Sequence, residues 1–509
     1  MRKIKVSFLF GAGAEIDYGF PDGGKFALDI FRYDSKEGKE FFKKLRNEID
    51  KNTTYSSEWL PDDYINKNVS SFGKSVYESI IKDTIEHNKD KIIKNINNFD
   101  NIAEEEKTHI NKQFHINISE IIENKINKNI ENSYIKNDLQ FIDSYNEGNK
   151  LFFSNYFSAL FEIYKNLNNK DLENKKIIDI SKLKEEINNI IISILELQIG
   201  ALSEKLSKKI NEGLFKTKND DYDFLDNIGD IIRLNYRSVG LMGLNYIMKP
   251  VINEYKEKDN YYIFLFYRRI VENIYSSVLD YKTLIDSNWR YLYYPKDEWA
   301  KFCKTSIFLY TVRNYIINKI ESFEIENKSY YDDLKKNRDK IIIQNISTTN
   351  YHTIIEKKLD EKIIHLNGST DLWYDPYLNI IDTKDNLLKN KKHFIVPLLY
   401  TQSGTKPMTS ISMLLNYVKM YKEFKESNII AVVGFGFNTD DEHINGILRT
   451  LVDIDDKELY LFDVDQNITV EKIAKRLKVE NKKNIKIFIL NKKDRTKDDK
   501  LWIDYLKKN

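Results

Sequence analysis

A single β-like run stands at the amino end of the chain, and the next run of this kind begins only at Ile341. The first run, Lys3–Phe10, is short, apolar and followed by glycine, which is typical of a buried strand in a parallel sheet. The later runs alternate with helix-like stretches, which predicts βαβ units and an α/β, Rossmann-like, mostly parallel sheet with helices on both faces. The later β-like runs are 341–346, 363–366, 394–400, 429–433, 459–464 and 485–490, and helix-like stretches lie at 413–425 and 443–451.

The residues between the first run and the later ones have a different character. From about Tyr33 to Lys340, Ile, Leu, Tyr and Phe recur at three- and four-residue spacing and are separated by polar residues, as in amphipathic helices. We therefore expect one sheet interrupted by a large all-helical insertion. The predicted sheet-forming domain is discontinuous and consists of residues 1–35 and 336–509, and the predicted helical domain is 36–335.

Charge and cysteine content exclude several classes of protein. The 509 residues include 80 Lys and Arg against 78 Asp and Glu, a formal net charge of +2, so there is no strong signal for nucleic-acid binding. Cys303 is the one cysteine, which excludes an intramolecular disulfide and a zinc site built on paired cysteines. No uncharged apolar run reaches the length of about 18 residues that a membrane-spanning helix needs. We expect a cytoplasmic protein that does not bind membranes.

A glycine-rich turn, Gly11-Ala12-Gly13-Ala14, follows the first run directly. Glycines at a strand-to-helix turn let a phosphate approach the backbone N–H groups at the start of the helix. The three-glycine dinucleotide motif is incomplete, however, because Ile16 stands at its third position. Nucleotide binding and a plain structural turn therefore both remain open for this segment alone.

A second glycine-rich segment, Gly19–Phe26, fits the pattern G-x-x-x-x-G-K of a phosphate-binding loop. Phe26 stands where such a loop needs a magnesium-binding Ser or Thr, and the preceding strand ends too early, at Phe10. We interpret the segment as a loop that covers a ligand.

Polar residues follow the first two of the later runs. Thr349 and Asn350 come shortly after the run 341–346, and His365 and Asn367 lie at the end of the run 363–366 and just beyond it. Ligands bind at the carboxyl ends of the strands in open α/β sheets. Asn350 could hold ribose hydroxyls and a water or simply cap its strand, and His365 could transfer protons or simply be hydrogen-bonded.

Two further strand ends carry small or acidic residues. The run 429–433 leads into Gly434-Phe435-Gly436, and the run 459–464 contains Asp463, which could accept hydrogen bonds from a ribose. Either segment could be an ordinary loop. Together with the other strand ends, they favour a nucleotide site at one edge of the sheet.

The ordered set of these motifs resembles the sirtuin family. More narrowly, it is similar to the sirtuin-like NAD-cleaving effectors of bacterial anti-phage systems, of the Thoeris, defence-associated sirtuin and Kongming kinds. The resemblance covers about the first 35 and the last 170 residues. Its motifs are Gly11-Ala12-Gly13-Ala14, Gly19-Phe20-Pro21-Asp22, Thr348-Thr349-Asn350-Tyr351, His365-Leu366-Asn367-Gly368-Ser369 and Val433-Gly434-Phe435-Gly436-Phe437.

The resemblance implies a site for NAD as substrate. Asn350 matches the family's catalytic asparagine, Asp22 lies in the loop that covers the nicotinamide side, and Asp463 or its neighbours lie near the adenosine end. The implied NAD-binding residues are Gly11, Ala12, Gly13, Glu15, Pro21, Asp22, Thr349, Gly434, Phe435, Gly436 and Asp463.

Two departures from the family pattern affect the chemistry. The family's usual Asp after Asn-Tyr is His352 here, and the His that normally precedes Gly368 is Asn367. That histidine is the family's expected base. Three answers stay open: His365 substitutes for it, His352 takes over, or the site binds NAD without cleaving it.

The resemblance therefore implies a regulated NAD glycohydrolase that acts in abortive infection against phage. The alternative is a catalytically degenerate module that binds NAD or ADP-ribose and scaffolds a partner. The four-cysteine zinc of protein-deacetylating sirtuins cannot form with Cys303 alone, so neither zinc nor another metal is expected. We expect a homo-oligomer, a partner protein of a defence system, or both, with the helical domain as the place of assembly.

Overall fold

The computed structural model describes residues 3–21, 23–133, 150–168, 177–201, 241–249, 251, 257–279, 288–321, 328–390, 392–399 and 410–507. The chain forms two compact units. The sheet unit consists of residues 1–22, 33–72 and 282–509, and the helical unit consists of 23–32 and 73–281. The predicted domain bounds at residues 35 and 336 remain a prediction, and the sheet unit also takes in α2 (Lys36–Glu48) and α14 (Trp299–Glu321).

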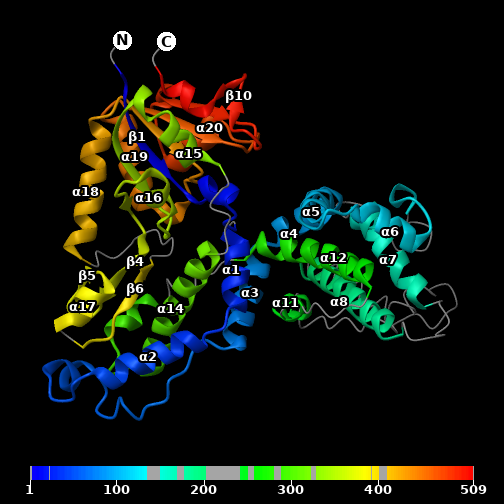
Figure 1. The fold of residues 1–509 in the computed structure, drawn as a ribbon, viewed down its shortest axis with the longest axis horizontal. Coiled ribbons are helices and arrows are strands. Elements are labelled where there is room, and N and C mark those ends of the chain that lie inside the picture. Colours follow the sequence, from blue (N-terminus) through cyan, green and yellow to red (C-terminus); the bar gives the residue numbers. More distant parts are fainter. Residues whose placement is uncertain are drawn as a thin grey trace. The chain divides into compact units, whose positions relative to one another are not determined.

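The sheet unit contains a six-stranded, all-parallel sheet with the order β3-β2-β1-β7-β8-β9. Counted along the chain, these six strands have the order 3-2-1-4-5-6 of a Rossmann-like sheet, which confirms the predicted α/β class. β1 lies between β2 and β7, next to strands that follow it only after the long insertion. Figure 1 shows the blue β1 among orange elements from the carboxyl-terminal part of the chain, such as α19. The strands are β1 (Lys5–Phe10), β2 (Ile342–Thr348), β3 (Ile364–His365), β7 (Ile429–Val433), β8 (Glu458–Asp463) and β9 (Ile485–Ile489).

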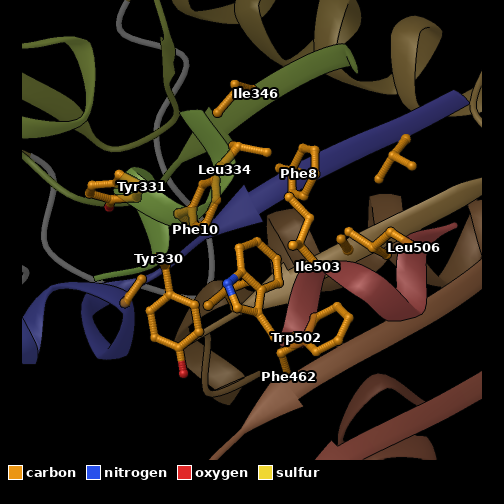
Figure 2. Close-up of a cluster of buried hydrophobic side chains, with 14 of the residues drawn as sticks. Phe8, Phe10, Tyr330, Tyr331, Leu334, Ile346, Phe462, Trp502, Ile503 and Leu506 are labelled. Carbon is orange, nitrogen blue, oxygen red and sulfur yellow. The ribbon is translucent and has the colours of Figure 1, made fainter. Parts of the chain in front are cut away.

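Helices and short turns cover both faces of this sheet. Side chains alternate along β1, so Phe8 and Phe10 face one hydrophobic cluster and Leu9 faces another. On the first face, Phe8 contacts Trp502 edge to face at 6.2 Å between ring centroids (Figure 2). That face is covered by α15 (Tyr330–Lys336), α16 (Ile354–Leu359) and η10 (Trp502–Leu506), and the other by α18 (Ile411–Lys425), α19 (Glu442–Asp453) and α20 (Val470–Leu477).

A second, antiparallel sheet has the order β5-β4-β6. Its strands are β4 (Gly368–Asp375), β5 (Ile380–Asp382) and β6 (Val396–Leu399). The expectation that the run 394–400 joins the parallel sheet was therefore wrong, and Tyr400 lies outside the described residues. A short apolar run predicts a buried strand but does not specify its partner. Here the partner is β4, whose Gly368 lets the two backbones approach closely, since a Cβ there would lie 1.9 Å from the Leu398 carbonyl oxygen.

The other elements of the sheet unit are short helices and strands. They are η1 (Ala12–Tyr18), η2 (Tyr55–Trp59), η6 (Trp289–Tyr293), η7 (Arg338–Lys340), α17 (Lys384–Asn390), η8 (Thr439–Asp441), η9 (Lys482–Asn484), β10 (Thr496–Lys497) and β11 (Lys500–Leu501).

The described residues of the helical unit form helices, as the spacing of their apolar residues predicts. These are α1 (Gly23–Arg32), α3 (Lys74–His87), α4 (Lys89–Asn97), α5 (Phe99–Phe114), α6 (Ile118–Ile126), η3 (Ile130–Asn132), η5 (Leu151–Phe153), α7 (Asn155–Asn168), α8 (Ile177–Ala201), α11 (Leu241–Ile247) and α12 (Lys258–Ser276). Across the described ranges of both units, no helix combines the length and the apolar character that crossing a bilayer requires.

Candidate functional site

The glycine-rich turns after β1 and β7 pack directly against each other. The Gly11 N–H donates to the Val433 carbonyl at 2.9 Å, and the Gly13 N–H donates to the Gly434 carbonyl at 2.9 Å. A Cβ on Gly11 would lie 2.5 Å from the Gly434 oxygen, and one on Gly434, whose φ is +64°, would lie 2.2 Å from the Ala14 nitrogen. Contact between the two turns therefore explains these glycines, and it lies where the strand order reverses, the usual ligand-binding position of such sheets.

The loop after β2 joins the same edge of the sheet. The Thr349 N–H donates to the Phe10 carbonyl at 3.0 Å, and the Asn350 side-chain amide donates to the Gly11 carbonyl at 3.1 Å. The Asn350 N–H in turn donates to the Thr348 hydroxyl at 3.1 Å. The structure thus brings together the ends of β1, β2 and β7, three of the strand ends that the sequence analysis placed in one site, and it buries Asn350 there.

Glu15 and His352 form a buried pair beside these loops. Both side chains are at most 3% exposed, and His352 Nε2 contacts Glu15 Oε2. The Tyr331 hydroxyl donates to the other Glu15 oxygen at 2.5 Å. The Phe20 ring stacks on the His352 ring with 4.1 Å between centroids. Among the described residues, the second ring nitrogen, His352 Nδ1, has no hydrogen-bond partner although it is buried.

His365 contacts the backbone of Asn350. Its Nδ1 is 2.8 Å from the Asn350 carbonyl oxygen, and its Nε2 is 2.5 Å from Glu356 Oε1. Burial lowers the pKa of His365, but the hydrogen bond and negative charge of Glu356, the Asn350 carbonyl and the charge of Glu15 raise it by more, so the net pKa is raised. His365 is therefore tied on both nitrogens to groups that favour its charged form.

Asn367 and Asp463 make local contacts that suffice to explain them. The Asn367 amide donates to the Thr349 carbonyl at 3.4 Å, which holds the loop after β2. Asp463 Oδ1 accepts from the N–H groups of Val464 and Asp465 at 2.7 and 2.9 Å, as in an ordinary turn after a strand.

The other predicted NAD-binding residues differ in exposure. Ala12 and Gly436 are exposed, Pro21 is partly exposed, and Phe435 is buried beside Phe437. Asp22 lies outside the described residues.

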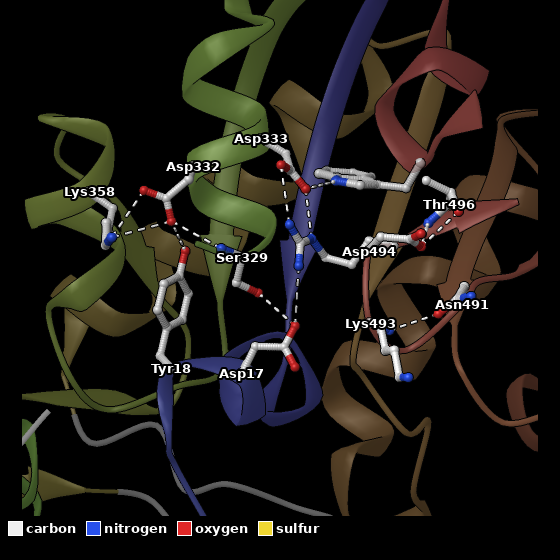
Figure 3. A network of polar contacts seen from close by, with 12 residues as sticks. Asp17, Tyr18, Ser329, Asp332, Asp333, Lys358, Asn491, Lys493, Asp494 and Thr496 are labelled. Atoms are coloured by element: carbon white, nitrogen blue, oxygen red, sulfur yellow. Dashed lines mark hydrogen bonds and ion pairs between the residues drawn. The ribbon is translucent and has the colours of Figure 1, made fainter. Parts of the chain in front are cut away.

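The helix expected after the first glycine turn is only η1, a 3-10 helix of seven residues. A polar network fixes it to the rest of the sheet unit (Figure 3). The Tyr18 hydroxyl donates to Asp332 at 2.7 Å, and Arg495 lies between Asp17 and Asp333, with its Nε donating to Asp333 at 2.7 Å. Burial, together with the hydrogen bond and charge of Asp332, raises the pKa of Tyr18. This network positions the segment that carries Glu15.

The segment Gly19–Phe26 is divided between the two units. Gly19 ends η1 with a φ of +96°, and α1 begins at Gly23. A Cβ on Gly24 would lie 1.5 Å from the Ser276 carbonyl oxygen of α12, so close helix packing explains this glycine.

Sequence reasoning missed Tyr331, Phe20 and Glu356 as members of the site. Tyr331 lies in the range 36–335 that was assigned to the helical domain, and nothing in the sequence marks it as a partner of Glu15. Phe20 is part of a motif that was quoted, but only its neighbours were singled out. Glu356 follows Asn350 by less than two helical turns, and an acid so close to a polar strand end was the available signal.

In the parts of the chain that the structure describes, no three His, Cys, Asp or Glu side chains are grouped to hold a metal ion. Comparison with protein-family models, curated proteins and solved structures found no match. Function must therefore be inferred from the residues of the site.

Proposed function

We propose that this protein is an NAD glycohydrolase, which hydrolyses NAD to nicotinamide and ADP-ribose. The observation that carries the proposal is the hydrogen bond from the Asn350 amide to the Gly11 carbonyl. It joins two of the motifs that carry the resemblance to sirtuin-like NAD-cleaving effectors, at the point of the sheet where α/β proteins bind nucleotides.

The chemistry of the surrounding residues suits this reaction. Glycosidic cleavage passes through an oxocarbenium-like state, which fixed polar groups stabilise better than water does. The edge of the sheet offers the Asn350 amide, the Glu15 carboxylate and the Tyr331 hydroxyl, all held in place by buried hydrogen bonds. The buried His352 Nδ1, for which the described residues provide no hydrogen-bond partner, is a polar atom that a bound ligand would satisfy.

We further propose that the enzyme is a cytoplasmic, regulated effector of anti-phage defence. Unregulated NAD hydrolysis would kill the host cell, so the activity needs a trigger or a partner protein. The helical unit is the proposed place of oligomer assembly. These points rest on the resemblance to sirtuin-like effectors.

The test is NAD turnover by the purified full chain, followed by the release of nicotinamide, with and without an extract of phage-infected cells. Asn350→Ala should abolish turnover. Asn345→Ala is the matched control, because Asn345 is a buried asparagine of β2, the strand that leads to Asn350, and its amide instead contacts Glu423. If wild type and Asn350→Ala leave NAD intact under all conditions while calorimetry shows NAD binding, the alternative of a binding module that scaffolds a partner replaces the enzyme.

A further inference from the structure

The two buried histidines of the site differ in the chemistry of their partners. His365 meets a backbone carbonyl at Nδ1 and a carboxylate at Nε2. A carbonyl oxygen and an ionised carboxylate only accept hydrogen bonds, so each ring nitrogen must donate. An imidazole that donates from both nitrogens is an imidazolium cation. It has no lone pair with which to take a proton from a substrate.

His352 has the opposite arrangement. Its Nε2 contacts Glu15, whose carboxylate also accepts the Tyr331 hydroxyl, so this nitrogen carries a proton. Within the described part of the chain, nothing donates to Nδ1 and nothing accepts from it. A second ring proton at Nδ1 would lack an acceptor there, so the geometry favours a lone pair at Nδ1, and a buried acceptor of this kind calls for an O–H or N–H donor.

We propose that His352 Nδ1 is the proton acceptor of the site and that His365 is a positively charged positioning residue for the Asn350 loop. This assignment rests on the proposed NAD hydrolysis, and it states which of the two histidines accepts the proton. Asn367, at the position of the family's usual histidine, carries an amide and has no basic nitrogen. The pairing of a carboxylate with one ring nitrogen and a reacting proton with the other is the arrangement that makes histidine an effective base.

The step balances as hydrolysis. The bond between the ribose C1′ and the nicotinamide nitrogen breaks, and its electron pair leaves with neutral nicotinamide. A water molecule adds to C1′, and its proton passes to His352 Nδ1. The Glu15 carboxylate stabilises the resulting imidazolium, which then releases the proton to solvent. The net reaction consumes NAD and water and yields nicotinamide, ADP-ribose and one proton.

The Phe20 ring does not lie in the direction of this lone pair. Hydrogen bonds to an imidazole nitrogen lie near the plane of the ring, whereas Phe20 stacks on its face with 27° between the ring planes. Phe20 belongs to the segment Gly19–Pro21, next to the end of η1. It therefore holds the ring in place without occupying the position of the transferred proton.

The protonation of the two rings can be measured without any turnover. The chain contains seven histidines, so substitution must assign their ring signals. In the full chain labelled with ¹⁵N-histidine at neutral pH, one of the assigned rings should be protonated only at Nε2 and the other at both nitrogens. His352→Gln should remove the first signal and His365→Gln the second. A doubly protonated His352, or a neutral His365, would overturn the proposal whether or not the protein cleaves NAD.

Turnover provides the second measurement. His352→Gln should lower the rate of nicotinamide release about 10²- to 10⁴-fold while NAD binding, measured by calorimetry, changes less than about tenfold. Added imidazole should restore part of the activity of His352→Ala but none of that of His365→Ala. His109→Gln, which changes an exposed histidine of α5, is the matched control. Full activity of His352→Gln contradicts this proposal alone, whereas an inactive wild type contradicts the proposed function.

Discussion

The charge on His365 links the site to the stability of the fold. Its raised pKa means that the folded chain holds this proton more tightly than the unfolded chain, in which the ordinary value is 6.5. The stabilisation is therefore fully present below pH 6.5 and is lost as the pH rises through the folded value. His365→Gln, which cannot take up the proton, should lower the free energy of unfolding by more at pH 6 than at pH 9.

Urea unfolding of wild type and variant at both pH values measures this difference. We expect a gap on the order of 1 kcal/mol at pH 6, because the variant loses hydrogen bonds to a charged group. Glu356→Gln should reduce the gap, since it removes the carboxylate that favours the charged form. A gap that grows with pH would mean that His365 is neutral in the folded chain.

At the scale of single residues, the sequence predicted which side chains gather but not how they pair. Asn350, Glu15 and both histidines follow or flank strand ends, and parallel strands bring such ends to one edge. The pairing of Glu15 with His352 depends on Tyr331, which comes from α15 and is far away in sequence. The orientation of a side chain toward such a distant partner has no local signal.

The contact between the turns after β1 and β7 can be tested by a substitution at Gly434. Gly434→Ala places a Cβ 2.2 Å from the Ala14 nitrogen on a residue with a φ of +64°. It should lower the free energy of unfolding by more than about 2 kcal/mol, because backbone atoms cannot move away as a flexible side chain can. It should also weaken NAD binding, since the turn after β1 must shift.

Gly446→Ala is the matched control for this substitution. Gly446 lies inside α19, and a Cβ there meets no atom within 4 Å. Alanine favours a helix over glycine, so this variant should gain up to about 1 kcal/mol. Chemical denaturation measures the free energy of unfolding of both variants. If the two variants lose the same amount, close contact is not the reason that position 434 requires glycine.

The carboxyl-terminal segment should stabilise the site through Arg495. Its side chain is 10% exposed and pairs with Asp333, which also accepts the Trp502 indole N–H at 3.1 Å. Arg495→Met removes one partner of a mostly buried pair and should cost about 3 kcal/mol of unfolding free energy. Arg338→Met, which breaks the more exposed pair with Glu361, should cost less than about 1 kcal/mol.

Thermal or urea unfolding of the two arginine variants gives the comparison. If Arg495→Met is no less stable than Arg338→Met, the Arg495 network is a surface feature without a structural role. If it is less stable but still binds NAD with unchanged affinity, η1 is positioned by its other contacts, such as the hydrogen bond from Tyr18 to Asp332.

At the scale of elements, the apolar runs predicted the strands of the parallel sheet well. Five of the later runs and the first one form its six strands. β4 and β5 were not expected, because Asp371, Asp382 and other polar residues interrupt their apolar pattern. The antiparallel partner of β6 was missed for the same reason.

For the whole molecule, the distribution of tryptophan makes the two units separately observable. All five tryptophans, at positions 59, 289, 299, 373 and 502, belong to the sheet unit. Tryptophan fluorescence should therefore follow the unfolding of that unit alone, whereas circular dichroism at 222 nm reports the helices of both. A ligand that binds a folded unit stabilises it by RT ln(1 + [L]/Kd), about 2.7 kcal/mol at a hundredfold excess over Kd.

Since the proposed site lies entirely in the sheet unit, NAD should move the fluorescence transition to higher urea. His352→Gln is the suitable background, because it is expected to slow NAD cleavage while changing NAD binding less than about tenfold. The part of the circular dichroism transition that does not coincide with the fluorescence transition reports the helical unit. Its urea midpoint should not change. A shift confined to that part would place the ligand on the helical unit, and the strand ends around Asn350 would then not be the NAD site.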